Sequence, residues 1–128
     1  MEFLFEKLEV YQRAMSLVEA VDALIETIKG RFPATRIDQL TRASLSIPLN
    51  IAEGNGRRRP AERSHFFTIA RGSVFECVAV LEVLKRKHLL PVEKHAQIYG
   101  DLQVVAKMIG GLIRHAEASA TSRPVQAT

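Results

Sequence analysis

The sequence predicts an all-α protein, an antiparallel up-down-up-down four-helix bundle with shallow left-handed crossings. In four separate segments, apolar residues recur at alternating spacings of three and four, which is the pattern of one buried helical stripe. An average spacing of about 3.5 residues gives shallow left-handed crossings between packed helices. The segments are similar in length and their connections are short, which favours antiparallel neighbours. No segment is a convincing strand.

The first expected helix carries its apolar stripe from Tyr11 to Ile28. Gly30 lies just beyond its end, at the position where glycine is favoured after a helix. Pro33 follows and cannot easily continue a helix. The chain therefore turns between these two residues.

The second expected helix runs from about Thr35 to a stop at Gly54. Pro48 lies inside it and removes one backbone donor, so we expect a kink or a locally tightened turn. Gly54 and Gly56 adopt left-handed or extended dihedral angles at little cost. We therefore expect these glycines to end the helix sharply and to open a tight loop.

The third expected helix opens at Pro60, a residue favoured in the first helical turn, and its stripe continues to Leu84. The fourth begins near Pro91 and carries its stripe from Ile98 to Leu112. The bundle then occupies residues 1–117. Residues 118–128 are rich in Ser, Thr and Ala, so we expect a disordered tail.

Composition restricts the class of protein. No apolar run approaches the roughly 18 residues that cross a bilayer, so no membrane contact is expected. The N-terminus lacks the basic region of a secretory signal. Cys77 is the one cysteine, so no disulfide can form within the chain. These features favour a cytoplasmic protein.

Positive charge is concentrated in the middle of the chain. Residues 29–71 hold nine basic and three acidic residues, a net charge of +6, whereas the whole chain has +4. Eight of the nine are arginine, which binds phosphate or carboxylate through two parallel hydrogen bonds. The asymmetry indicates a polyanion or an acidic protein as partner, although a solvated surface without a partner has the same composition. The candidate nucleic-acid-binding residues are Arg57, Arg58, Arg59, Arg63, Arg36 and Arg42.

A group of polar and small residues violates the local preferences of a helix. Glu53 lies in a last turn, where the helix dipole disfavours an acid, so we expect Arg57 or Arg71 to meet it. A mid-helix glycine costs about 1 kcal/mol relative to alanine, which suggests that a neighbouring helix approaches closely. The group is either a polar layer that determines the register of the bundle or a ligand pocket. Its members are Asn50, Glu53, Gly54, Gly56, Gly72, Ser73 and Glu76, with Ser73 and Glu76 expected to face Asn50 or Arg42.

The third helix is apolar on more than one face, because Phe66, Ile69, Phe75, Val80 and Val83 lie off its main stripe. A helix of this kind is either central or shared with another subunit. We therefore expect a homo-oligomer, with a wide bundle core as the alternative.

No catalytic residue, metal site or cofactor is predicted. Glu62 and His65 have the E-x-x-H spacing of di-iron bundles, but such sites need two copies and the chain has one. Arg59 and His65 resemble the R-x(4–6)-H motif of the HEPN ribonucleases, which are also helical bundles. A ribonuclease is therefore a lesser alternative, in which arginine stabilises phosphate and histidine moves a proton.

Three stretches together resemble a bacterial four-helix-bundle family, the proteins encoded in intervening sequences of 23S ribosomal RNA genes. The accessory variability protein of diversity-generating retroelements is a relative. The resemblance spans about residues 8 to 115. Its motifs are Leu8-Glu9-Val10-Tyr11-Gln12-Arg13-Ala14, Gln39-Leu40-x-Arg42-Ala43-Ser44-x-Ser46-Ile47-Pro48-x-Asn50-Ile51-Ala52-Glu53-Gly54-x-Gly56-Arg57 and Phe67-x-Ile69-Ala70-x-Gly72-Ser73-x-x-Glu76.

The resemblance implies a homopentameric ring of bundles with a basic surface. The retroelement relative binds nucleic acid and associates with a reverse transcriptase. We therefore expect a non-enzymatic scaffold that contacts RNA or DNA, or a nucleic-acid-processing partner such as a reverse transcriptase. The alternative is a protein-interaction module with an acidic partner. Because aromatic stacking platforms are lacking, binding of nucleic acid should be mainly electrostatic and weakly selective.

Overall fold

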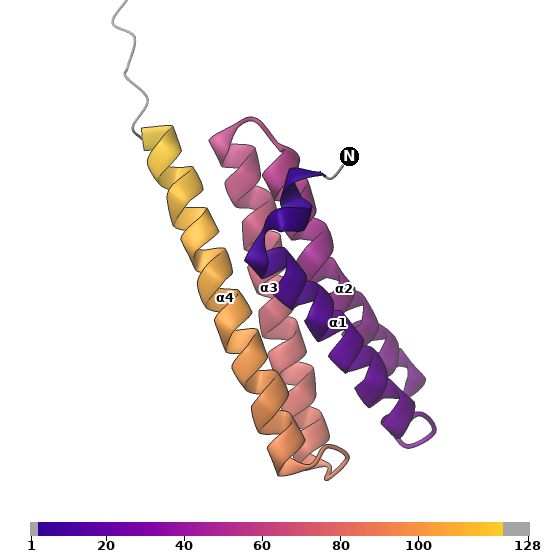
Figure 1. The fold of residues 1–128 in the computed structure, drawn as a ribbon. Helices are drawn as coiled ribbons and strands as arrows, with labels where there is room; N and C mark the ends of the chain where they lie inside the picture. The colour runs from indigo at the N-terminus through magenta and orange to yellow at the C-terminus, as the bar shows by residue number, and fades with distance from the viewer. Residues whose placement is uncertain (1–2, 122–128) are drawn as a thin grey trace, which may run out of the picture.

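The structure, a computed structural model, describes residues 3–121 and contains four long helices after one short 3-10 turn. No strand occurs in this part of the chain. The predicted four-helix bundle is thereby confirmed (Figure 1). The elements are η1 (Leu4–Lys7), α1 (Glu9–Ile28), α2 (Ala34–Gly56), α3 (Pro60–Arg86) and α4 (Val92–Thr121).

The helices pack in a ring of neighbours, with α2 on α3, α3 on α4, and α1 on both α2 and α4. Two ends of the bundle result (Figure 1). The turn end holds the α1–α2 turn (residues 29–33) and the α3–α4 turn (residues 87–91). The loop end holds the α2–α3 loop (residues 57–59), together with η1 and the C-terminal part of α4.

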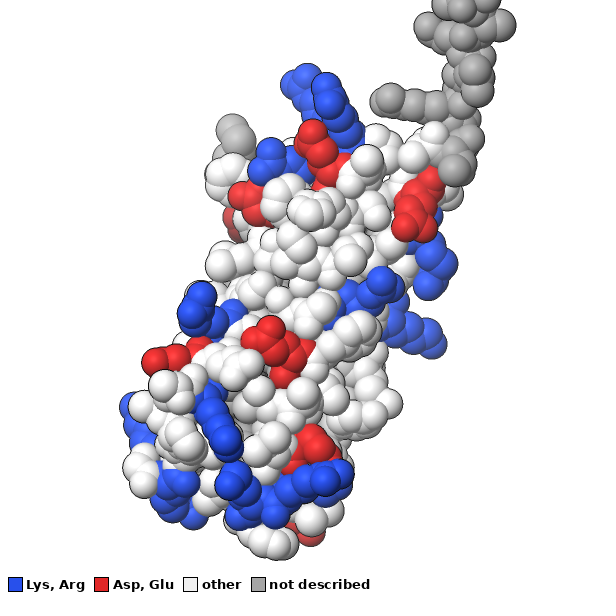
Figure 2. Space-filling view, turned by 180° about the vertical axis from the view of Figure 1, so that it is seen from behind, with Lys and Arg blue, Asp and Glu red and all other residues white. Residues whose placement is uncertain are grey.

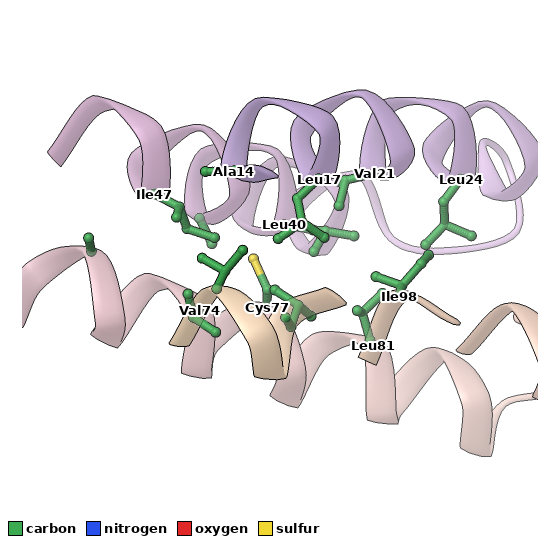
Figure 3. Packing of buried hydrophobic residues seen from close by; sticks show 14 of the residues in the cluster. Ala14, Leu17, Val21, Leu24, Leu40, Ile47, Val74, Cys77, Leu81 and Ile98 are labelled. Atoms are coloured by element: carbon green, nitrogen blue, oxygen red, sulfur yellow. The ribbon is translucent and has the colours of Figure 1, made fainter. Parts of the chain in front are cut away.

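The core lies along the bundle axis, where all four helices contribute apolar side chains (Figure 3). Burying one leucine-sized side chain stabilises a fold by about 1.5–3 kcal/mol, so this stripe supplies the main driving force. The predicted stripes are the buried faces. In Figure 3 the labelled side chains of α1 and α2 face those of α3 and α4 across the core. They are Ala14, Leu17, Val21 and Leu24 of α1, Leu40 and Ile47 of α2, Val74, Cys77 and Leu81 of α3, and Ile98 of α4.

The α1–α2 turn follows the prediction. Gly30 has a φ of 81°, in the left-handed region that glycine enters at little cost. The amide of Arg31 donates to the carbonyl of Ile28, which satisfies one of the last acceptors of α1.

The expectation for Gly54 and Gly56 is confirmed in part. Helix α2 does end at this pair, at Gly56, and a short loop leads to Pro60, but the expected stop at Gly54 is wrong and neither glycine has a positive φ. Gly54 serves packing instead, because a Cβ there would lie 2.6 Å from Cε1 of the buried Phe67. Gly56 has open space around it. Pro48 is buried inside α2, which remains one continuous helix.

Two further expectations need correction. A Cβ at Gly72 would meet no atom within 4 Å, so within this chain the glycine does not permit the close approach of a helix. Helix α4 extends to Thr121, so residues 118–121, expected in the tail, are helical. Residues 122–128 lie outside the described part of the chain.

Candidate nucleic-acid interface

The loop end presents four of the six candidate arginines. Arg57, Arg58 and Arg59 form the connection between α2 and α3, and all three side chains are exposed. Pro60 then begins α3, and Arg63 lies one turn further along. A short loop fixed by two helix ends therefore holds several guanidinium groups in a small region.

Arg57 contacts both the last turns of α2 and the side chain of Phe66 on α3. Its Nη2 lies 2.9 Å from Oε2 of Glu53, and its guanidinium lies 4.8 Å from the ring centroid of Phe66. The predicted pairing of Glu53 is thereby confirmed, with Arg57 as the partner. Both charges are about half exposed, and exposed pairs contribute about 0–1 kcal/mol, so the pair orients Arg57 more than it stabilises the fold.

Arg63 has a structural role that the sequence did not reveal. Its Nη1 donates to the carbonyl of Asn55 at 3.0 Å and to the carbonyl of Arg57 at 3.2 Å. The last carbonyls of a helix lack partners within the helix, and a guanidinium supplies the missing donors. Arg63 therefore joins the end of α2 to the start of α3.

Arg58 and Arg59 remain available for an outside anion. Neither side chain forms an ion pair with any residue of 3–121. Arg58 and Arg63 border a loop-end hollow of about 310 Å³. His115 of α4 adds an imidazole, and none of the carboxylates in residues 3–121 lines the hollow. The lining residues are Arg58, Pro60, Arg63, His115, Ala116 and Ser119.

The other two candidate arginines lie elsewhere on α2. Arg36 is near the turn end, with its guanidinium 5.7 Å from the ring centroid of Phe32. Arg42 lines the α2–α3 groove, a hollow of about 520 Å³ that also contains Asp38 and Glu76. Carboxylates in this groove oppose a polyanion. The structure thus does not bring all six arginines to one surface.

The expected polar network exists in part. Oγ of Ser73 donates to Oγ of Ser46 at 2.8 Å, and Nδ2 of Asn50 donates to the same oxygen at 2.9 Å. Ser46 is the member that sequence reasoning missed, although it lies one helical turn before Asn50. Glu76 is exposed and forms no ion pair within residues 3–121. The observed network is a small polar contact between α2 and α3.

Arg59 and His65, the pair of the ribonuclease alternative, lie on different kinds of backbone. Arg59 is the extended residue that precedes α3, whereas His65 lies within that helix. Across residues 3–121, no group of three or more His, Cys, Asp or Glu is placed to hold a metal ion.

No helix within residues 3–121 is long and apolar enough to cross a membrane.

Comparisons with known proteins agree with this architecture. Residues 6–111 match the family described as 23S rRNA-intervening sequence protein. A similar solved structure is a protein of unknown function of the S23 ribosomal protein family from Bacteroides thetaiotaomicron. It shares 22% identity, with a TM-score of 0.74 over 81% of this chain and 97% of that chain. At this identity the likeness shows the fold alone. No curated protein matches.

Proposed function

The chain belongs to the 23S rRNA-intervening sequence protein family, and we propose that it is a non-enzymatic, homo-oligomeric scaffold whose loop end binds nucleic acid. RNA is the favoured ligand. A nucleic-acid-processing enzyme such as a reverse transcriptase, bound together with that RNA, is the favoured protein partner.

The proposal rests on the exposure and the lack of ion pairs of Arg58 and Arg59 within the described residues. Both side chains are exposed and form no ion pair within residues 3–121, whereas donors of Arg57 and Arg63 already bind oxygen atoms of the protein. Arg58 also borders a hollow that no carboxylate of the described residues lines. Guanidinium groups match phosphate geometry, and a surface without acids does not repel a polyanion. Recognition of this kind reads the backbone and not the base sequence.

Filter binding of a structured RNA at rising salt tests the proposal. Each phosphate contact contributes about 0.7–0.9 to the slope of log affinity against log salt, so Arg58→Gln/Arg59→Gln should reduce that slope by about 1.4–1.8. Lys107→Glu is the matched control, because it also changes the charge by −2 and lies at the middle of α4. Undetectable binding at low salt, or equal slopes for the double variant and the control, would refute the nucleic-acid function.

Exposed apolar side chains of α2 and α3 support self-association. Leu45 and Leu49 of α2 are exposed, as are Ile69 and Phe75 of α3, with Phe75 at 58% and Leu49 at 56%. Large exposed apolar side chains are typical of a surface that a second subunit covers. The open space at Gly72 lies on the same helix.

Light scattering tests the oligomer, for which the family resemblance implies five copies of the 14.3 kDa chain. Leu49→Glu/Phe75→Glu should reduce the mass to that of one chain, because two charges would be buried without partners. Val104→Glu, at an exposed apolar position on α4, should leave the mass unchanged. A wild-type monomer, or an assembly that tolerates the double variant, would contradict the interface.

Two assays address the remaining parts. Incubation with labelled RNA should give no cleavage, in either the wild type or His65→Ala; cleavage lost in His65→Ala would establish the ribonuclease instead. When the protein is purified from the native host, nuclease treatment should release bound RNA and reduce the amount of processing enzyme that co-purifies. A protein partner retained without RNA would favour the acidic-partner module.

A further inference from the structure

The turn end is a second basic surface, assembled from segments far apart in the sequence. Lys29 and Arg31 come from the α1–α2 turn. Lys85 and Arg86 come from the end of α3, Lys87 from the α3–α4 turn, and Lys94 from the first turn of α4. Figure 2 shows Lys and Arg side chains gathered around this end of the bundle.

Three of these cations are already engaged by the protein. Nζ of Lys29 lies 2.8 Å from Oε1 of Glu26, and Nε of Arg86 lies 3.1 Å from Oε1 of Glu82. Nη2 of Arg31 donates to the carbonyl of Thr27 at 2.7 Å.

Lys87 and Lys94 are the counterparts of Arg58 and Arg59 at the other end. Both are exposed, and neither forms an ion pair with any residue that the structure describes. Their ammonium groups are therefore available to an outside anion.

A hollow of about 540 Å³ lies at this end, bordered by two of these cations, Arg31 and Lys94. His88 and Thr27 add further polar groups, and Leu24 and Leu90 contribute apolar ones. No carboxylate of the described residues lines the hollow. In composition it repeats the loop-end hollow, which also has two permanent cations, one histidine and no acid. The α2–α3 groove differs, because Asp38 and Glu76 line it.

The two basic ends are separated by the length of α3. This helix has 27 residues, which at 1.5 Å per residue span about 40 Å. A straight A-form RNA duplex of 8 base pairs is shorter than B-DNA of the same number of pairs, which is about 27 Å long at 3.4 Å per pair, so it cannot touch both ends.

We propose that the turn end is a second binding surface for the phosphate backbone of RNA, so that one bundle holds two RNA segments about 40 Å apart. Holding two segments rests on the proposed function, because the loop end supplies the first site. The turn-end site is carried by Lys87, Lys94 and the hollow with Arg31. A scaffold of this kind would bring two parts of a folded RNA into a defined spatial relation.

Titration with an 8-base-pair RNA hairpin at low salt tests the inference by counting hairpins bound per chain, which does not depend on the oligomeric state. The wild type should bind two. Lys87→Gln/Lys94→Gln and Arg58→Gln/Arg59→Gln should each bind one, and the quadruple variant none. Lys107→Glu, with the same change of charge as either double variant, should bind two. Circular dichroism of each variant establishes that it is folded.

The outcomes separate the two proposals. One hairpin per wild-type chain, unchanged by Lys87→Gln/Lys94→Gln and lost in Arg58→Gln/Arg59→Gln, would overturn the turn-end site and leave the proposed function standing. One hairpin that is lost only in Lys87→Gln/Lys94→Gln would support the turn-end site and refute the loop end. No hairpin on the wild-type chain would overturn both.

Discussion

Gly54→Ala should destabilise the bundle, although alanine is ordinarily the better helix former. A Cβ at this position would lie 2.6 Å from Cε1 and 2.7 Å from Cδ1 of Phe67, and 3.2 Å from the carbonyl oxygen of Arg63. The Phe67 ring is fully buried, so it cannot swing into solvent to make room. Either the ring leaves its rotamer or α2 moves away from α3.

The size of the effect follows from two opposing contributions. Overpacking a buried site costs about 1–3 kcal/mol, and two contacts below van der Waals distance place this site near the upper limit. Replacing a mid-helix glycine with alanine returns about 1 kcal/mol. We therefore expect a net loss of about 2 kcal/mol in the free energy of unfolding.

Urea unfolding followed by circular dichroism measures this loss. Gly100→Ala is the matched control, because a Cβ there meets no atom within 4 Å and the substitution should stabilise by up to about 1 kcal/mol. Measurement at two protein concentrations separates folding from self-association. Adding Phe67→Leu to Gly54→Ala should cost less than the sum of the single changes. If Gly54→Ala were as stabilising as Gly100→Ala, the packing explanation for this glycine would be wrong.

Three further predictions concern single residues. Burial raises the pKa of the Cys77 thiol to about 12. Because the thiolate is the reactive form, a disulfide reagent at pH 8 should not modify the native protein but should react fully in denaturant. Rapid modification of the native protein would contradict a closed core. His88 has a φ of 57°, a left-handed conformation that glycine adopts at less cost than other residues. His88→Gly should therefore raise the free energy of unfolding by about 0.5–1 kcal/mol. A lower free energy of unfolding would show that the histidine side chain contributes more stability than its backbone conformation costs. The hydrogen bond from Arg86 holds the pKa of Glu82 below its ordinary value. A carboxylate whose pKa is lower in the folded state than in the unfolded state stabilises the fold above the unfolded-state pKa, and this stabilisation is lost as the pH falls through the folded-state pKa. The difference in free energy of unfolding between wild type and Glu82→Gln should therefore shrink on acidification below about pH 4.5. A difference that grew below this pH would contradict the role of Arg86.

The helices were predictable because their signal is local and repeated. The stripe from Ala14 through Leu17, Val21 and Leu24 recurs every three or four residues, and each member is buried. The left-handed turn at Gly30 was predictable for a related reason, because few residues besides glycine enter that conformation at little cost.

The function of Gly54 could not be predicted by the same reasoning. From the sequence alone, a glycine that ends a helix cannot be distinguished from a glycine that leaves room for an aromatic ring of a neighbouring helix. The deciding atom belongs to Phe67, thirteen positions away on another helix. Gly72 shows the converse, since its mid-helix position suggested close packing and the space beside it is open.

The candidate site was predictable only where its residues are adjacent in sequence. Arg57, Arg58 and Arg59 are consecutive, so their density is visible without a structure. Lys85, Arg86 and Lys87 are also consecutive, so their density is visible without a structure as well. The sequence does not show that these residues and Lys94 meet the α1–α2 turn, because the antiparallel bundle is what brings the two turns to one end.

The two ends nevertheless share one construction, which explains why a cation count alone cannot identify the binding residues. At the loop end Arg63 donates to the carbonyl of Asn55 near the end of α2, and at the turn end Arg31 donates to the carbonyl of Thr27 near the end of α1. Each of these arginines also lines the hollow of its end. A guanidinium has five N–H donors in a planar fork, so one edge can satisfy helix carbonyls while another faces an anion. Arg63 and Arg31 therefore each bind a carbonyl near a helix end and also line the hollow at that end. Because part of each guanidinium is already bound to the protein, the neighbouring exposed cations supply the rest of the positive charge for an anion.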